Sequence, residues 1–219
     1  ELALSYKEVI EKLRGVDIPE PMKSQIHQIL YSDVPASLRY ITTSVRKMDA
    51  LLTGLLTLSR LGRQQVNIKD IDMNALIRDV VSTLQFSIKQ SQVKVKYDRL
   101  EPCRGDERML SQVFSNLIDN AVKYLKPDRD GLIEISSHRS NGYCVYTVKD
   151  NGIGMDPQYQ KQIFDIFYRL DPESKVAGQG LGLSIVKSIV DRHKGKITVE
   201  TEPDRGTAFT ISLPADQQN

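Results

Sequence analysis

Three short stretches of the chain combine residue types that suit a phosphorylated ligand and a metal ion. The segment 116–124, NLIDNAVKY, lies within a run of helical periodicity. The segment 150–154, DNGIG, directly follows an alternating run typical of a strand, and 178–183, GQGLGL, directly precedes another apolar helical pattern. None of the three is sufficient alone. Together they can hold a nucleoside triphosphate and its metal.

The first stretch presents two carboxamides and one ammonium on one side of its helix. At about 100° per residue, Asn116, Asn120 and Lys123 fall within about 60° of arc, away from the apolar face. Carboxamide oxygens are hard neutral ligands that suit Mg²⁺, and an ammonium is a compact cation that can neutralise phosphate. A solvated surface has the same composition, so this face alone leaves both interpretations open.

The second stretch places a carboxylate where a strand ends. Asp150 can accept a hydrogen bond from an exocyclic amine, and Gly152 and Gly154 let a flat ring approach the backbone. An ordinary turn is an equal alternative for this stretch, because Asp-Asn-Gly is a common turn sequence.

The third stretch carries glycines at alternate positions, Gly178, Gly180 and Gly182, immediately before a helix. Such glycines leave backbone N–H groups able to face phosphate, and the helix N-terminus adds a favourable dipole. The stretch is neither a lysine-bearing phosphate loop nor a dinucleotide fingerprint. We therefore predict that it contacts phosphate.

The elements that must position these stretches fall into two regions, residues 1–63 and residues 64–219. The first region is helical and carries a seam of apolar residues at spacings of three and four: Leu38, Ile41, Val45, Met48, Leu52 and Leu55. We expect an antiparallel hairpin that packs on the stripe from Leu2 to Leu13 and dimerises as a helical bundle. A hairpin without dimerisation is the alternative. Pro19, Pro21 and Pro35 interrupt the pattern in a connector that can still carry a short helix.

From residue 64 onward, strand and helix patterns alternate. Asp72 is expected to cap one helix, a second runs from about 107 to 125, and a third follows Gly182. Strands are expected at 66–68, 93–97, 132–136, 143–149, 196–201 and 207–213. The pattern predicts an α/β sandwich, in which helices cover one face of a mixed, mostly antiparallel sheet.

Composition excludes several classes of protein. The net charge of +2 comes from 30 basic and 28 acidic residues that are interspersed, which argues against a nucleic-acid binder. Cys103 and Cys144 lack metal-ligand spacing and favour a reducing, cytoplasmic setting. No apolar run approaches the roughly 20 residues of a membrane span. Because the chain begins in mid-helical pattern without Met, we expect a piece of a longer protein whose sensor or membrane anchor lies outside it.

The order of the motifs resembles the ATP-binding domain of sensor histidine kinases, within the ATPase group shared with gyrase, Hsp90 and MutL. The segment 116–124 is similar to the family's asparagine box, 150–154 and 178–183 to its glycine boxes, and 164–169 to its phenylalanine box. The segment 206–214 is similar to its closing strand. The resemblance covers about residues 66–214, whereas the helical region resembles the family's dimerisation and phosphotransfer hairpin more loosely.

This resemblance implies that the chain binds ATP and Mg²⁺. Asn120 would bind the metal, with Asn116 beside it as a metal or phosphate contact. Lys123 would meet phosphate, Tyr124 the ribose or base edge, and Arg169 the terminal phosphate.

At the base, Asp150 would accept from the adenine amine, and Gly152, Ile153 and Gly154 would shape the pocket. The other implied nucleotide contacts are Gly178, Gly180, Leu181, Gly182 and Thr207. Residues 170–179 would form a mobile lid, and Phe164 and Phe167 would be core anchors.

The family's phosphoacceptor histidine is missing, because His27, His138 and His193 do not stand in the required motif. We expect it upstream of Glu1, so that the fragment alone cannot phosphorylate itself. The resemblance implies transfer of the γ-phosphoryl of ATP to that histidine and then to an aspartate of a response regulator receiver domain. A non-catalytic scaffold and an anti-sigma-type serine kinase stay open. Steady ATP hydrolysis is not expected, since gyrase-like relatives have a glutamate base where Asn116 stands.

Overall fold

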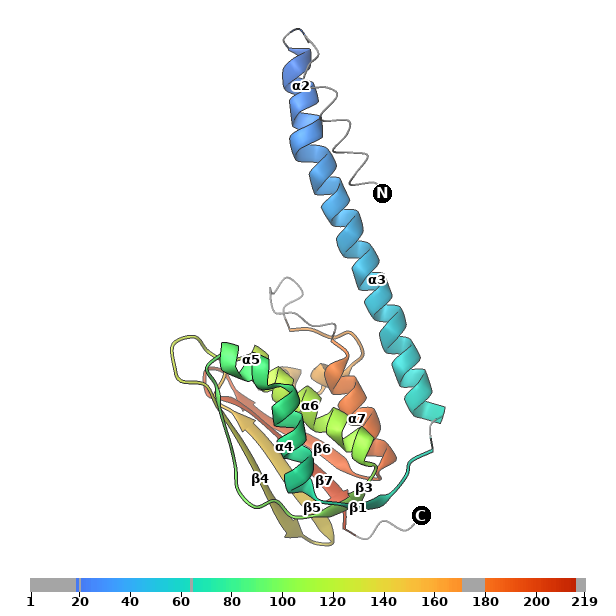
Figure 1. Ribbon diagram of the computed structural model, residues 1–219, viewed down its shortest axis with the longest axis vertical. Helices are drawn as coiled ribbons and strands as arrows, with labels where there is room; N and C mark the ends of the chain where they lie inside the picture. The colour runs from blue at the N-terminus through green and yellow to red at the C-terminus, as the bar shows by residue number, and fades with distance from the viewer. Residues whose placement is uncertain (1–18, 20, 64, 171–179, 216–219) are drawn as a thin grey trace. The chain divides into compact units, whose positions relative to one another are not determined.

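The structure is a computed structural model that describes residues 19, 21–63, 65–170 and 180–215 (Figure 1). Its contacts divide the chain into two units, Glu1–Leu52 and Thr53–Asn219, which are considered separately below. The first arm of the expected hairpin, Gly178 and nearly all of the expected lid lie outside the described residues.

The helical region is formed by α2 (Met22–Gln28), a π-helical turn η1 (Ile29–Asp33) and α3 (Val34–Arg63), which follow one another without a break. The short helix expected in the connector is therefore confirmed. The expected interruption at Pro35 is wrong, because the wider π turn precedes the proline and closes with a bond from Val34 N–H to Ile29 C=O. Within the described residues, no helix combines the length and the apolar character that a membrane span requires.

A five-stranded sheet forms the centre of the second unit. Its strand order is β2 (Lys94–Tyr97), β4 (Leu132–Ser140), β5 (Tyr143–Asp150), β7 (Gly206–Pro214) and β6 (Lys196–Glu202). Only β2 and β4 pair in parallel, and the other neighbours are antiparallel. The predicted mixed, mostly antiparallel sheet is confirmed.

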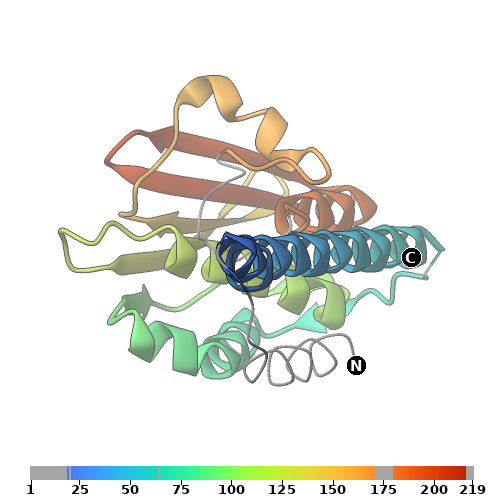
Figure 2. The same ribbon diagram turned by 90° about the horizontal axis from the view of Figure 1, so that it is seen from above.

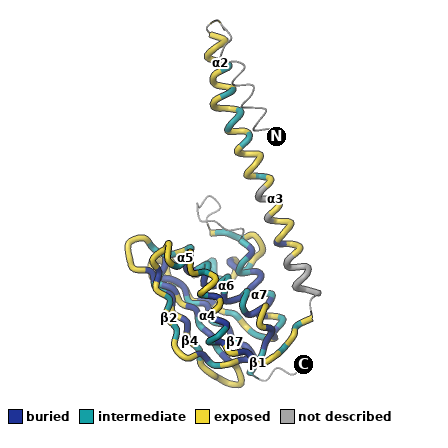
Figure 3. The backbone as a smooth tube through the Cα atoms, viewed as in Figure 1, coloured by how far each residue is buried: buried dark blue, intermediate teal, exposed yellow. Residues whose placement is uncertain are grey.

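Helices cover one face of this sheet: α4 (Met73–Thr83), α5 (Gln85–Gln90), α6 (Glu107–Lys123) and α7 (Gly182–Arg192) (Figure 1). α6 and α7 lie side by side (Figure 2). Buried residues gather between this helical layer and the sheet (Figure 3), where Phe114 of α6 meets Tyr146 of β5 edge to face with ring centroids 5.8 Å apart. The α/β sandwich is confirmed.

Two short strands make a separate antiparallel pair, β1 (Lys69–Ile71) with β3 (Cys103–Gly105). The strand predicted at 66–68 is wrong by three residues, because the Asn67 N–H donates to Asp106 Oδ2 at 3.0 Å and not to a neighbouring strand. The predicted cap is confirmed, since Asp72 Oδ1 accepts from the N–H groups of Asn74 and Ala75.

Candidate nucleotide-binding site

Helix α6 positions the polar face that carries the two expected amides. Asp106 caps the helix by accepting from the N–H groups of Arg108 and Met109 at 3.1 Å. The opposite face is buried in the core through Leu110, Val113, Phe114, Leu117, Ile118, Ala121 and Val122. Because that face is fixed, Asn116 and Asn120 are held on the side that lines a cavity.

Two adjoining cavities collect the candidate residues. The phosphate cavity, as we name it, is lined among others by Gln112, Asn116, Asp119, Asn120, Lys123, Tyr124, Tyr168, Arg169, Gly180, Leu181 and Gly182. The base cavity, of about 90 Å³, is lined among others by Asn120, Tyr124, Asp150, Ile153, Gly154, Met155, Tyr168, Arg169, Leu183, Thr207 and Phe209. Asn120, Tyr124 and Arg169 line both cavities, so the two form one continuous site. Two of the predicted site residues, Asn116 and Thr207, are 91 positions apart in the sequence and thus meet at one site.

Asp150 is the carboxylate of the base cavity and is only 7% exposed. Its Oδ1 accepts from the N–H of Gly152 at 2.8 Å and from the N–H of Thr207 at 3.3 Å. Burial raises the pKa of Asp150 to about 6, against the opposing effect of these two bonds. Among the described residues, Oδ2 has no hydrogen-bond partner, so it can accept from a ligand amine.

Close backbone approach explains most of the glycines. A Cβ would lie 2.2 Å from Tyr124 O at Gly152, 2.0 Å from Glu202 O at Gly154 and 2.7 Å from Phe167 C at Gly180. Gly154 and Gly180 also have positive φ, at 60° and 69°. Gly152 does not line either cavity and shapes the base cavity through its bond to Asp150.

Gly182 differs from these glycines. A Cβ there would meet only the side chain of Asn116, at an ordinary 3.7 Å. Contacts with the described residues therefore do not require glycine at the first residue of α7. The space beside Gly182 lies at a helix N-terminus, where phosphate binds favourably. Asn116 Nδ2 donates to Gly182 O at 3.3 Å, which joins the amide face to this terminus.

The chemistry of the donors fits Mg²⁺. Among the described residues, no group of three or more His, Cys, Asp or Glu side chains could hold a metal. Asn116 and Asn120 supply amide oxygens in the phosphate cavity, and Mg²⁺ takes few protein ligands when phosphates and water complete its shell.

Residues 105–217 match the family described as histidine kinase-, DNA gyrase B-, and HSP90-like ATPase. The chain belongs to this family. It is 31% identical over 208 residues to the phytochrome-like protein Cph1 of Synechocystis sp., covering 90% of this chain and 28% of that protein. It is 34% identical over 182 residues to the methanogenesis regulatory histidine kinase FilI of Methanothrix harundinacea, covering 83% and 20%.

The solved catalytic domain of histidine kinase ThkA is 25% identical, with a TM-score of 0.59 over 68% of this chain and 96% of that domain. Within this family, the matched region, residues 105–217, belongs to an ATP-binding domain of the sensor histidine kinase type. The chain spans only 28% of the length of Cph1 and 20% of the length of FilI.

The three histidines of the chain lie in different surroundings. His193 is fully buried, where Nε2 accepts from the Asp106 N–H at 2.9 Å and Nδ1 faces Ile189 O at 2.8 Å. Burial lowers the pKa of His193. His138 lies within β4 and not in the turn after it, since β4 is longer than expected, and His27 stacks on Tyr31 in the helical region.

The phenylalanine box is only partly an anchor for the core. Phe164 packs edge to face on Phe209 with centroids 6.4 Å apart, as expected. The expectation for Phe167 is wrong: it has a φ of 67° and is 37% exposed. Its N–H donates to Gly180 O at 2.9 Å, and this bond holds the backbone in the conformation that turns the ring outward.

The structure adds cavity residues that the sequence analysis missed. Asp119 forms an ion pair with Lys123 at 2.5 Å, and the i,i+4 spacing of opposite charges was the available signal. Gln112 is one turn before Asn116 on the same helix face. Tyr168, whose hydroxyl donates to Gln162 Oε1 at 2.9 Å, lines both cavities, but aromatic type alone did not separate it from the core.

Proposed function

We propose that this chain is the ATP-binding catalytic region of a two-component sensor histidine kinase. The observation that carries the proposal is the meeting of Asn120, Asp150 and Gly182 around two adjoining cavities. One cavity offers Asp150 Oδ2, which has no partner among the described residues, for a base, and the other offers amides, an ammonium and a helix N-terminus for phosphates. This division matches the two ends of a nucleoside triphosphate.

At the base end, Asp150 Oδ2 would accept from the exocyclic amine of adenine. The N–H groups of Gly152 and Thr207 hold Oδ1, so the carboxylate has a fixed direction before the ligand arrives. Ile153 and Gly154 line the same cavity and would contact the ring. Tyr124, which lines both cavities, would contact the ribose or the edge of the base.

At the phosphate end, Asn120 and Asn116 would hold Mg²⁺, which when bound supplies positive charge against the phosphate oxygens. Lys123 would exchange its Asp119 partner for phosphate, since both side chains line the phosphate cavity. Arg169 would approach the terminal phosphate. The backbone of Gly180, Leu181 and Gly182 would face the phosphate chain, as would Gly178 outside the described residues.

The phosphoryl group would leave this domain. We infer that the γ-phosphoryl passes to a histidine outside the chain and then to an aspartate of a response regulator receiver domain. Residues 1–63 would contribute to a homodimeric hairpin, residues 64–219 would be the kinase domain, and a sensor domain would lie elsewhere in a longer protein. Two buried thiols, Cys103 and Cys144, agree with a cytoplasmic location for this region.

Incubation with γ-labelled ATP tests where the phosphoryl group goes. The chain alone should stay unlabelled, whereas the same chain extended upstream should acquire acid-labile, base-stable label typical of phosphohistidine. Acid-stable label on a serine of an added protein substrate would support the serine-kinase alternative. Acid-labile label on His27 would contradict the proposal that the acceptor lies outside.

A further inference from the structure

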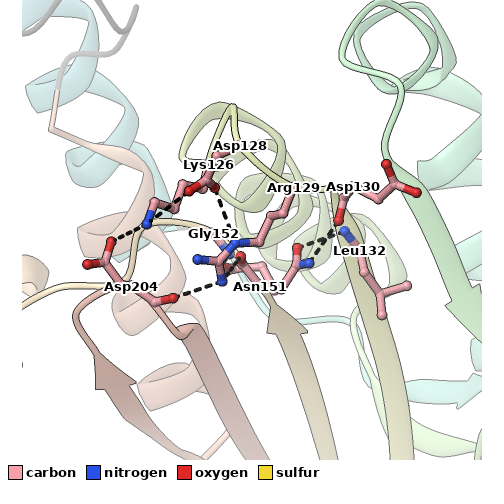
Figure 4. Close-up of polar contacts among 9 residues, drawn as sticks. Lys126, Asp128, Arg129, Asp130, Leu132, Asn151, Gly152 and Asp204 are labelled. Atoms are coloured by element: carbon pink, nitrogen blue, oxygen red, sulfur yellow. Dashed lines mark hydrogen bonds and ion pairs between the residues drawn. The ribbon is translucent and has the colours of Figure 1, made fainter.

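The turn 151–154, which follows Asp150, is held from outside by two other segments (Figure 4). Asn151 Oδ1 accepts from the Leu132 N–H at 2.8 Å, and its Nδ2 donates to Asp130 O at 2.8 Å. On the other flank, the Asp204 N–H donates to Ile153 O at 2.7 Å. The turn that supplies Ile153 and Gly154 to the base cavity therefore lies between the loop 125–131 and the β6–β7 turn.

Arg129 joins these flanks. Its Nη1 donates to Asp204 O at 2.8 Å and is 3.5 Å from Asn151 O (Figure 4). Lys126 adds an ion pair with the Asp204 carboxylate at 2.8 Å and a second with Asp128 at 3.3 Å. The two basic residues differ in what they bind. Lys126 contacts side-chain carboxylates. Arg129 also lies 3.5 Å from the Asp128 carboxylate through Nε, but its Nη1 additionally contacts main-chain carbonyls on two segments.

Around Asp150 these segments lie in close backbone contact. A Cβ on Gly206 would lie 2.1 Å from Asp150 O, and one on Gly154 would lie 2.0 Å from Glu202 O. The N–H groups that fix Asp150 Oδ1 come from Gly152 in the turn and from Thr207 after the β6–β7 turn. Any shift of one segment against the other therefore moves a donor of the Asp150 carboxylate.

We propose that Arg129 is a positioning residue for base recognition. By joining Asn151 and Asp204 through their carbonyls, it fixes the Asp150 carboxylate in the direction that an adenine amine requires. Arg129 itself lines an outer hollow with Lys126 and Asp128, so it acts through the turn and not by touching the nucleotide. This inference rests on the proposed function, because it assumes that the base cavity binds ATP.

The test combines a variant with a ligand that lacks the recognised group. Affinities of wild type, Arg129→Ala and Arg129→Lys are measured by calorimetry for Mg-ATP and for Mg-purine riboside triphosphate, which has no exocyclic amine. Arg205→Ala is the matched control, because it removes the same charge beside the same turn and the Arg205 guanidinium bonds only the Glu202 side chain among described groups. Thermal melting of each variant checks that it is folded.

Arg129→Ala should weaken ATP binding about tenfold and purine riboside triphosphate binding less than about twofold, the difference expected from one charge-assisted hydrogen bond. Arg129→Lys should lie between, since lysine keeps the charge but is one atom shorter and lacks the planar guanidinium that places Nη1 near both carbonyls. Arg205→Ala should leave both affinities unchanged.

Equal losses for the two nucleotides would overturn the positioning role, as would an Arg129→Ala variant that behaves like Arg205→Ala. A wild-type chain that fails to bind Mg-ATP would instead refute the proposed function itself. The two failures are thus distinguishable.

Discussion

At the scale of single residues, the site separates groups that the fold requires from groups that only a ligand explains. Gly152, Gly154 and Gly180 are required by backbone contacts that leave no room for a side chain. Gly182 has room for one, and Asp150 keeps an oxygen without a partner among the described residues. The last two are therefore the sharpest points at which to test nucleotide binding.

Gly182→Ala should weaken Mg-ATP binding by about tenfold or more, because the new methyl group would occupy the space of a phosphate. Alanine is the better helix former by about 0.5–1 kcal/mol, so the melting temperature should stay the same or rise. Calorimetry and thermal melting measure the two effects. Gly180→Ala is the contrast: its positive φ and backbone contact predict a lower melting temperature. A Gly182→Ala variant with unchanged affinity would count against a phosphate at α7.

Asp150 links nucleotide binding to pH. The ionised Asp150 carboxylate accepts a hydrogen bond from the adenine amine. The affinity for Mg-ATP should therefore fall as the pH drops through about 6. Without ligand, the folding stability depends on pH in the opposite direction. The folded pKa is raised from 3.8 to about 6, so the folded state holds the extra proton and stability decreases as the pH rises across that interval.

Asp150→Asn should therefore abolish the pH dependence of binding near pH 6 together with most of the affinity. At pH 7 the unliganded variant should be more stable than wild type by at most about 3 kcal/mol, the equivalent of this pKa shift. Urea unfolding at pH 4 and pH 7 checks the sign. Wild-type stability that rises between these two pH values, without a matching rise in Asp150→Asn, would contradict it.

At the scale of elements, α6 and α7 are joined at both ends of their contact. Asn116 of α6 bonds the first residue of α7, and His193 after α7 accepts from the N–H of Asp106, the cap of α6. Both bonds restrict sliding of one helix along the other. This explains how the amide face and the glycine-rich helix start keep their register.

His193→Ala should destabilise the second unit by roughly 2–4 kcal/mol, because it leaves the Asp106 N–H buried without an acceptor and opens a cavity. The contribution of His193 to stability should decrease as the pH falls below about 6.5, opposite in direction to that of Asp150, since burial lowers the folded pKa of His193 and the unfolded chain binds the proton first. Denaturant titration at several pH values measures this slope. His193→Gln should flatten it, and an unchanged slope in that variant would assign the effect to another group.

The elements also show what the sequence could and could not predict. The cap at Asp72 and the alternating strands depend on neighbouring residues, so local patterns identified them. The position of β1 was missed because Asn67 bonds a cap 39 residues away, which no local pattern records. The candidate residues were predicted from motifs, but their meeting in two cavities required the tertiary structure. Tyr168 was missed for the same reason, whereas Asp119 had a local signal in its i,i+4 spacing from Lys123.

At the scale of the whole molecule, the seam on α3 is the main apolar surface of the described helical region. Ile41, Val45, Met48, Leu52 and Leu55 are 56–62% exposed in the single chain. An apolar helical stripe of this kind favours pairing with another helix. Dimerisation remains a prediction.

Leu52→Glu should convert a dimer to a monomer, because it places charge in the middle of the seam. Light scattering across a concentration series measures the mass, and retained Mg-ATP affinity shows that the second unit is intact. Thr42→Glu, also on exposed α3 but outside the seam, is the control. A wild-type chain that is monomeric at high micromolar concentration would contradict a dimer formed by these residues alone.

The most direct measurement is calorimetric titration of the wild-type chain with Mg-ATP, repeated with Asp150→Asn and Gly182→Ala. One site per chain in the wild type and weaker binding in both folded variants are expected, since the two changes lie at opposite ends of one nucleotide. Absence of heat at millimolar Mg-ATP, or affinity that neither variant changes, would contradict a nucleotide held between these residues and would favour a non-catalytic scaffold.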